Sequence, residues 1–214
     1  MKRLRRTRLN KKGFTIIELM IATSVLATIL LMVTVMMIGI GKLYYKGINQ
    51  ARVQDNVRSI GDELAQHLQL SDQGPQQAGT PINVSIAGHP YVINAYCIDN
   101  TRYSYIIGVQ IGSIPHVLWR DPTPSTGCTT PAALNNPGLS GGTELIAPHS
   151  RLTDFTISPL TSPYSISVGV AYGDDDLLTL NGVNTTCKSV TGDQFCSAAG
   201  LTTVVVQRII PSGG

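Results

Sequence analysis

The strongest constraint on this chain is a long uncharged stretch near its N-terminus. From Leu19 to Gly41 the sequence contains no charged residue, and residues 14–18 lengthen this apolar stretch with a single acid, Glu18. As a helix rising about 1.5 Å per residue, the stretch reaches roughly 35 to 40 Å, enough to cross a hydrocarbon core of about 30 Å. A cleavable secretory signal is shorter and ends in a small-residue cut site. Residues 14–41 are therefore predicted to span a membrane.

Basic residues come just before this stretch and predict its orientation. Seven of the sixteen basic residues lie in the first twelve positions: Lys2, Arg3, Arg5, Arg6, Arg8, Lys11 and Lys12. Positive charge favours the cytoplasmic side, so residues 1–13 are predicted to be a cytoplasmic leader and the chain after Lys42 to lie across the membrane. Without the leader, nine basic residues face thirteen acidic ones, a net charge of −4. Binding to nucleic acid is therefore not predicted from charge.

The helical pattern continues beyond the membrane stretch as an amphipathic helix over residues 42–70. Apolar residues recur at spacings of mostly three and four among charged ones: Ile48, Val53, Val57, Ile60, Leu64 and Leu68. Ser71, Asp72, Gly74 and Pro75 then end the helix near Leu70. Tyr44 and Tyr45, beside Lys42 and Lys46, suit the outer membrane interface.

The head, residues 71–214, reads as β structure. Seven strands are expected, at residues 82–86, 91–98, 103–111, 117–120, 151–158, 164–172 and 201–210, with a surface loop over 121–142. The predicted fold class is therefore α+β: a long N-terminal helix, transmembrane in its first half and amphipathic in its second, packed on a C-terminal antiparallel sheet.

A specific motif occupies the start of the apolar stretch. It combines a basic leader, a glycine, an aromatic residue and an acid at the fifth position after the glycine, in the run Lys11, Lys12, Gly13, Phe14, Thr15, Ile16, Ile17, Glu18, Leu19, Met20 and Ile21. This run resembles the cleavage signature of type IV prepilins, pseudopilins and related subunits. The resemblance covers roughly residues 1–70 and implies a pilin-like fold.

The resemblance also implies roles for three residues. A prepilin peptidase is expected to cut between Gly13 and Phe14 and to N-methylate the new amine of Phe14. A carboxylate in an apolar helix costs on the order of 3 kcal/mol on insertion scales and is functional by default. The implied partner of Glu18 is the Phe14 amine of an adjacent subunit, so that an unassembled helix would carry an unpaired acid.

Other partners implied by the resemblance are further pilin subunits, which contact the chain through their N-terminal helices, and the pilus assembly platform. The implied filament contacts include Leu26, Ile29, Leu30, Leu31, Val33 and Met36. Many major pilins carry a proline in this helix, whereas this chain has only Gly39, Gly41 and Gly47, where bending is expected.

The leading functional hypothesis is a minor type IV pilin, a structural subunit of a filament used for adhesion, twitching motility or DNA uptake. The first alternative is a minor pseudopilin of type II secretion, which shares all these motifs. A signal-anchored surface binding protein or enzyme is the second alternative, and it predicts an uncut N-terminus. Enzymatic activity and cofactors are not predicted, because no nucleophile with a base and an orienting acid can be assembled from the spacing.

Four cysteines, Cys97, Cys128, Cys187 and Cys196, all lie beyond the membrane stretch, which fits an oxidising compartment and two disulfides. Three pairings are open from the sequence. The resemblance implies Cys187 with Cys196, as in the disulfide-bounded C-terminal loop of many pilins, and leaves Cys97 with Cys128. Metal ligation is not expected without CxxC spacing. The run Asp174, Asp175 and Asp176 is interpreted as a solvated turn in preference to a calcium site.

Overall fold

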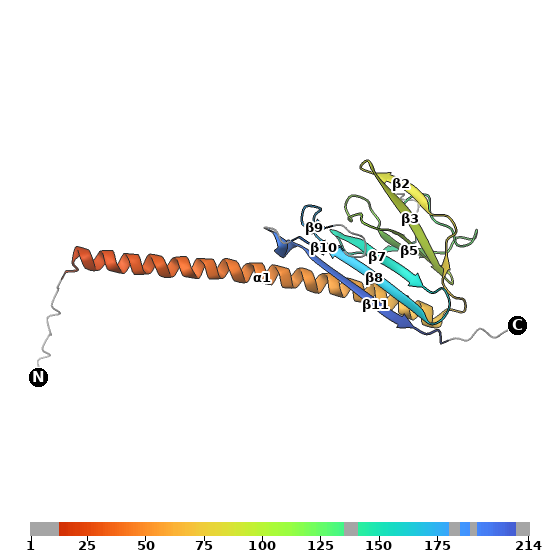
Figure 1. Cartoon of the computed structure of the whole chain (residues 1–214), viewed down its shortest axis with the longest axis horizontal. Helices are drawn as coiled ribbons and strands as arrows, with labels where there is room; N and C mark the ends of the chain where they lie inside the picture. Colours follow the sequence, from red (N-terminus) through yellow and green to blue (C-terminus); the bar gives the residue numbers. More distant parts are fainter. Residues whose placement is uncertain (1–12, 135–140, 180–184, 189–191, 209–214) are drawn as a thin grey trace, which may run out of the picture. The chain divides into compact units, whose positions relative to one another are not determined.

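The computed structural model describes residues 13–134, 141–179, 185–188 and 192–208. Its first element is helix α1 (Ile16–Leu70), which is 55 residues long (Figure 1). The expected end at Leu70 is confirmed, and the Ser71 hydroxyl there donates to the Leu68 carbonyl at 3.1 Å. The helix is continuous through Gly39, Gly41 and Gly47. The expected basic leader, apart from Gly13, lies outside the described residues.

Contacts divide the chain into two compact units, Met1–Leu43 and Tyr44–Gly214. In the second unit, α1 buries one stripe of side chains: Asn49, Val53, Val57, Ile60, Gly61, Leu64 and Leu68. Five of the six expected apolar positions belong to this stripe, while the sixth, Ile48, is half-buried and its neighbour Asn49 is buried instead. The spacing of three and four residues thus selects the face of α1 that packs on the strands.

In the described part of the head, the strands form three antiparallel sheets. The largest has the order β1-β3-β4-β5-β6, with β2 also paired to β3, and is built from β1 (Gln76–Gln77), β2 (Ile82–Ile86), β3 (His89–Ile98), β4 (Thr101–Ile106), β5 (Leu118–Pro122) and β6 (Thr143–Glu144). The second has the order β11-β8-β7, from β7 (Ser150–Ser158), β8 (Tyr164–Tyr172) and β11 (Ser197–Val205). The third pairs β9 (Leu178–Thr179) with β10 (Thr186–Cys187).

The α+β class is confirmed, with differences in detail. The strands divide among three sheets instead of forming one. The strand expected over 103–111 stops at Ile106, because Gly108 has a φ of 86° and turns the chain. The last strand begins at Ser197 and ends at Val205, earlier than the expected 201–210, of which 209–210 lie outside the described residues.

The core lies between the buried stripe of α1 and the inner faces of the strands. Figure 1 shows β7, β8 and β11 side by side along the C-terminal half of α1. Leu201 of β11 packs so closely on Gly61 that a Cβ there would lie 2.7 Å from its Cδ2 atom. Asn56 adds polar contacts, donating to the Leu145 carbonyl at 2.8 Å and accepting from the Ala147 N–H at 3.1 Å. Helix and strands are therefore fixed by both apolar and polar contacts.

A polar cluster joins α1 to the larger sheet around Tyr103, whose side chain is fully buried. The Tyr103 hydroxyl donates to Glu63 Oε1 at 3.2 Å and lies 2.9 Å from His67 Nδ1. Arg120 Nη1 donates to the same Glu63 oxygen at 2.9 Å. Burial, and secondarily the Glu63 carboxylate, raise the pKa of Tyr103 well above its ordinary value.

This raised pKa predicts a loss of stability in alkali. The unfolded chain releases the Tyr103 proton above about pH 10, whereas the folded chain keeps it. The contribution of Tyr103 is thus complete below that pH and falls by about 1.4 kcal/mol per pH unit above it. We expect Tyr103→Phe to lose less stability than the parent between about pH 9 and 11, measured by urea unfolding followed by circular dichroism. Equal alkaline losses in variant and parent would contradict this assignment.

Candidate functional site

The start of α1 is closed by a reciprocal capping box. Thr15 is the residue before the helix, and Glu18 is its third residue. The Glu18 N–H donates to Thr15 Oγ1, the Thr15 N–H donates to Glu18 Oε2, and the Thr15 hydroxyl donates to that same oxygen, each at 3.3 Å. The Leu19 N–H donates to the Thr15 carbonyl at 3.1 Å, which closes the first turn. Thr15 and Glu18 thus satisfy each other's backbone donors.

This geometry gives Glu18 local hydrogen-bond donors, and a charged partner for it stays a prediction. Its carboxylate accepts two hydrogen bonds from Thr15, and it lies at the helix N-terminus, where the partial positive charge favours an acid. Among the residues that the structure describes, none is a cation paired with Glu18. Thr15 was not among the predicted site residues, although the sequence contains the Thr-x-x-Glu spacing of a capping box.

The bond between Gly13 and Phe14 lies outside the helix. Both residues precede α1, and the Phe14 side chain is 81% exposed. A Cβ added at Gly13 would meet no atom within 4 Å. Both residues are therefore exposed, and the chain's own fold does not require glycine at position 13.

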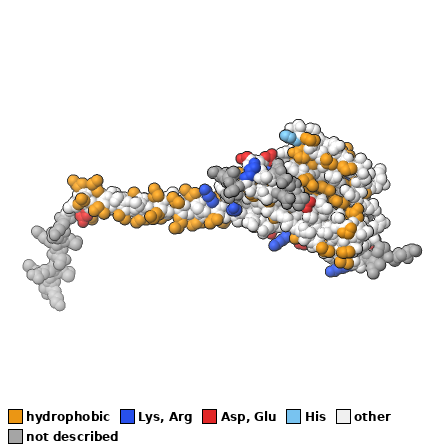
Figure 2. Space-filling view, in the orientation of Figure 1, with side chains coloured by type: hydrophobic (Ala, Val, Ile, Leu, Met, Phe, Trp, Pro, Cys, Tyr) orange, Lys and Arg blue, Asp and Glu red, His pale blue; other side chains and the backbone are white. Residues whose placement is uncertain are grey.

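Apolar side chains surround the first half of α1 on all sides. Figure 2 shows hydrophobic side chains covering this part of the helix. The six residues with implied filament contacts, from Leu26 to Met36, are each at least half exposed. The hydroxyls of Thr23, Ser24, Thr28 and Thr34 donate to carbonyls three or four residues earlier, at 2.8 to 3.0 Å. With its polar groups satisfied internally, this surface suits lipid or other apolar helices.

Both cysteine pairs in the head are bonded. Cys97 is joined to Cys128, and Cys187 to Cys196, each pair with a Cα–Cα distance of 5.8 Å. Cys97 and Cys128 tie the loop after β5 to β3, which adds a covalent link to the larger sheet. Cys187 and Cys196 close a short loop between β10 and β11.

Two basic side chains contact oxygen atoms of the acidic turn after β8. Lys188 Nζ donates to the carbonyls of Asp175 and Asp176 at 3.3 and 3.0 Å. Arg151, itself buried, pairs with Asp175 Oδ1 at 2.5 Å. Within the described ranges, no group of three or more His, Cys, Asp or Glu side chains could hold a metal ion. Lys188 and Arg151 therefore engage two backbone carbonyls and one carboxylate of this turn.

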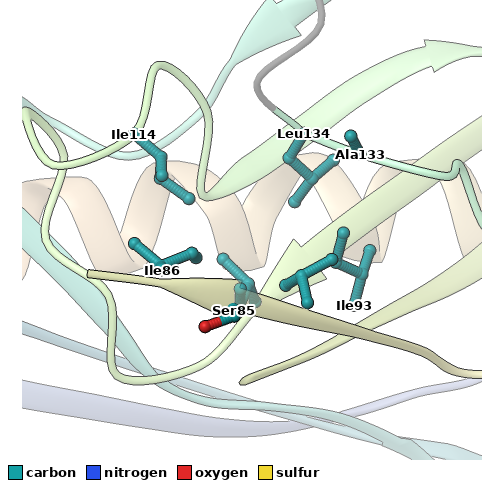
Figure 3. Close-up of a pocket in the computed structure, with 8 residues that line it drawn as sticks. Ser85, Ile86, Ile93, Ile114, Ala133 and Leu134 are labelled. Carbon is teal, nitrogen blue, oxygen red and sulfur yellow. The ribbon is translucent and has the colours of Figure 1, made fainter. Parts of the chain in front are cut away.

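An apolar cavity of about 240 Å³ lies between the β2–β3 hairpin and the loops around Ile114 and Leu134. Ile86 and Ile93 face Ile114 and Leu134 across it (Figure 3). None of the residues that line it is titratable. Ser85 contributes a hydroxyl to its lining, and no lining residue is a base that could activate this hydroxyl.

Comparison with known families assigns the N-terminal part of the chain. Residues 8–40 match the family described as prokaryotic N-terminal methylation motif. No curated protein and no solved structure matches the chain. The matched residues contain the Gly13–Phe14 bond, the capping box and most of the exposed apolar helix.

The capping box predicts a measurable change in the first helical turn. Thr15→Ala removes both side-chain contacts to Glu18 and should weaken the turn by about 1 kcal/mol. We expect amide hydrogen exchange at Glu18 and Leu19 to quicken about fivefold, measured by NMR on the full chain in detergent micelles. Thr15→Ser is the matched control, because it keeps the hydroxyl. Equal exchange in the alanine and serine variants would contradict the cap.

Proposed function

We propose that this chain, which carries the N-terminal methylation motif of type IV pilins and pseudopilins, is a minor type IV pilin. The family is structural and non-enzymatic, and the motif at residues 8–40 is the observation that carries the proposal. The leader 1–13 is removed by a prepilin peptidase. Residues 14–41 anchor the subunit and later join the filament core, residues 42–70 support the head, and residues 71–214 form it.

The motif and the apolar first half of α1 describe a single-pass inner-membrane protein with its head outside. Two disulfides in the head suit that oxidising side. The proposed final location is a cell-surface filament. Its proposed partners are other pilin subunits, the prepilin peptidase and the assembly platform.

Cleavage creates the charge that Glu18 is proposed to meet. Cutting between Gly13 and Phe14 leaves an amine one residue before the capping box, and methylation keeps it cationic. In the free subunit Thr15 holds the Glu18 carboxylate at the helix start. In the filament, the amine of a neighbouring subunit offers Glu18 a full positive charge in surroundings of low dielectric constant, where such a pair is stronger than in water.

A minor pseudopilin of type II secretion is the close alternative, because it carries the same methylation motif. Loss of piliation on gene deletion supports the pilin, and loss of protein secretion supports the pseudopilin. A signal-anchored surface binding protein or enzyme is the second alternative. It keeps its leader, so processing separates it from the other two.

Processing is tested by the intact mass of the full chain extracted from the membranes of cells with an active prepilin peptidase. We expect a chain that starts at methylated Phe14. Gly13→Val should block the cut, because the extended backbone cannot then enter the peptidase without a clash. The variant side chain has open space in this structure, so a block reports on the peptidase and not on misfolding. An intact Met1 in the parent chain would refute the filament assignment.

Assembly is tested separately with Glu18→Ala. The variant should still insert and be cut, while its recovery in sheared filaments should fall at least tenfold, as expected for the loss of an interaction of about 1.4 kcal/mol or more. Asp55→Ala is the matched control, because it removes an exposed carboxylate from the same helix outside the membrane stretch. Normal incorporation of Glu18→Ala would rule out this role for the acid.

A further inference from the structure

Three exposed aromatic rings gather where the second compact unit begins. Tyr44 is 66% exposed, Tyr45 is 54% exposed, and Phe195 from the loop before β11 is 47% exposed. The ring centroids of Tyr44 and Tyr45 are 6.1 Å apart, and those of Tyr45 and Phe195 are 6.0 Å apart. We call these three residues the aromatic base. An exposed phenylalanine beside exposed tyrosines is a surface that water solvates poorly.

Phe195 is held firmly in this position. It ends the short helix η2 (Asp193–Phe195), inside the loop that Cys187 and Cys196 close. Asn49 is buried and lies one helical turn after Tyr45 in α1. Its side chain donates to the Gln194 carbonyl at 3.1 Å. Figure 1 shows the blue segment leading into β11 lying against α1. The disulfide and the Asn49 contact thus fix an apolar ring that the core of the head does not bury.

The depth of the aromatic base in the membrane follows from the number of residues between the uncharged stretch and Tyr45. The uncharged stretch ends at Gly41, and Tyr45 is four residues later in the same helix. At 1.5 Å per residue, the Tyr45 Cα lies about 6 Å beyond the stretch, the depth of the lipid headgroups. Phe195 contacts Tyr45 and so lies at a similar depth. Aromatic rings concentrate at this depth, and flanking lysines such as Lys42 suit the phosphates there.

We propose that the disulfide-closed loop docks on the outer leaflet around the chain's own anchor, with Phe195 inserted among the lipid headgroups. The occupant of this surface is lipid, since Tyr44 and Tyr45 follow the membrane-spanning stretch in the sequence and Phe195 contacts Tyr45. Lipid contact of this kind orients the head of a free subunit at the membrane. The proposal rests on the membrane anchor and is independent of filament assembly.

The experiment places a tryptophan at position 195 in the full chain. Phe195→Trp is compared with Leu160→Trp in phosphatidylcholine–phosphatidylglycerol vesicles that carry a nitroxide near the headgroup. Leu160 is 42% exposed and lies beside Gly74, past the far end of α1 and about 37 Å along the helix from Tyr45. Trp119 is buried and supplies the same background in both variants. The two reporters therefore lie at opposite ends of the part of α1 that packs on the head.

We expect lipid nitroxide to quench Phe195→Trp strongly and aqueous iodide to quench it weakly, with the reverse for Leu160→Trp. Quenching of Phe195→Trp by iodide and not by lipid would overturn the proposal. Protection from both quenchers would also overturn it, because a second copy would then cover the ring. Vesicles are recovered by flotation, so only inserted chains are measured, and failure to float would contradict the anchor itself.

A second variant tests the fixed position of the loop. Asn49→Ala in the Phe195→Trp chain removes the donor to Gln194 and should release the loop from α1. We expect lipid quenching to fall and iodide quenching to rise. Unchanged quenching would show that α1 does not place Phe195 at the membrane and would overturn that step.

Discussion

The packing of the buried α1 stripe against the strands is the interaction on which the second unit depends. Val57, Leu64 and Leu68 are almost fully buried, whereas apolar residues in the first half of the same helix are exposed. A stripe at spacings of three and four gives the helix one face for the strands. Apolar residues on every side give it no preferred face. One continuous helix therefore packs on the strands of the head with its second half and suits an apolar environment with its first half.

Two sets of polar contacts lie near the ends of the apolar stretch. At its start, the capping box gives the Glu18 carboxylate local donors, so that an acid is tolerated where an isolated one would be costly. Just beyond its end, Asn49 fastens the disulfide-closed loop to α1. The hydroxyls between them bond back to the helix. The apolar stretch thus leaves few polar groups that demand a partner outside the chain.

Local patterns in the sequence predicted the local structure well. The end of α1 and the bounds of β2 and β8 were predicted correctly, because breakers and strict alternation mark them. The early end of β4 was missed, since the turn at Gly108 depends on its backbone φ. The sequence indicated an interfacial position for Tyr44 and Tyr45 but did not predict that Phe195 joins them. Phe195 and Tyr45 are far apart in the chain, and only tertiary packing brings their rings together. Thr15 differs from Phe195, because the Thr-x-x-Glu spacing that indicates its role is local in the sequence.

In the proposed assembly, the subunit moves from lipid to the filament core, and the hydrophobic effect gives this move little direction. Lipid tails are about as apolar as leucine side chains, so the exposed surface of α1 stays away from water in both places. The difference in free energy must then come largely from packing and from polar groups. In this proposal, Glu18 replaces its hydrogen bonds to neutral Thr15 with an ion pair to the cationic Phe14 amine of a neighbour. Because that amine forms only on cleavage, an uncut neighbour is a poor partner. If the aromatic base also contacts lipid, leaving the membrane removes that contact, and the combined gain from helix packing and from Glu18 must exceed that loss.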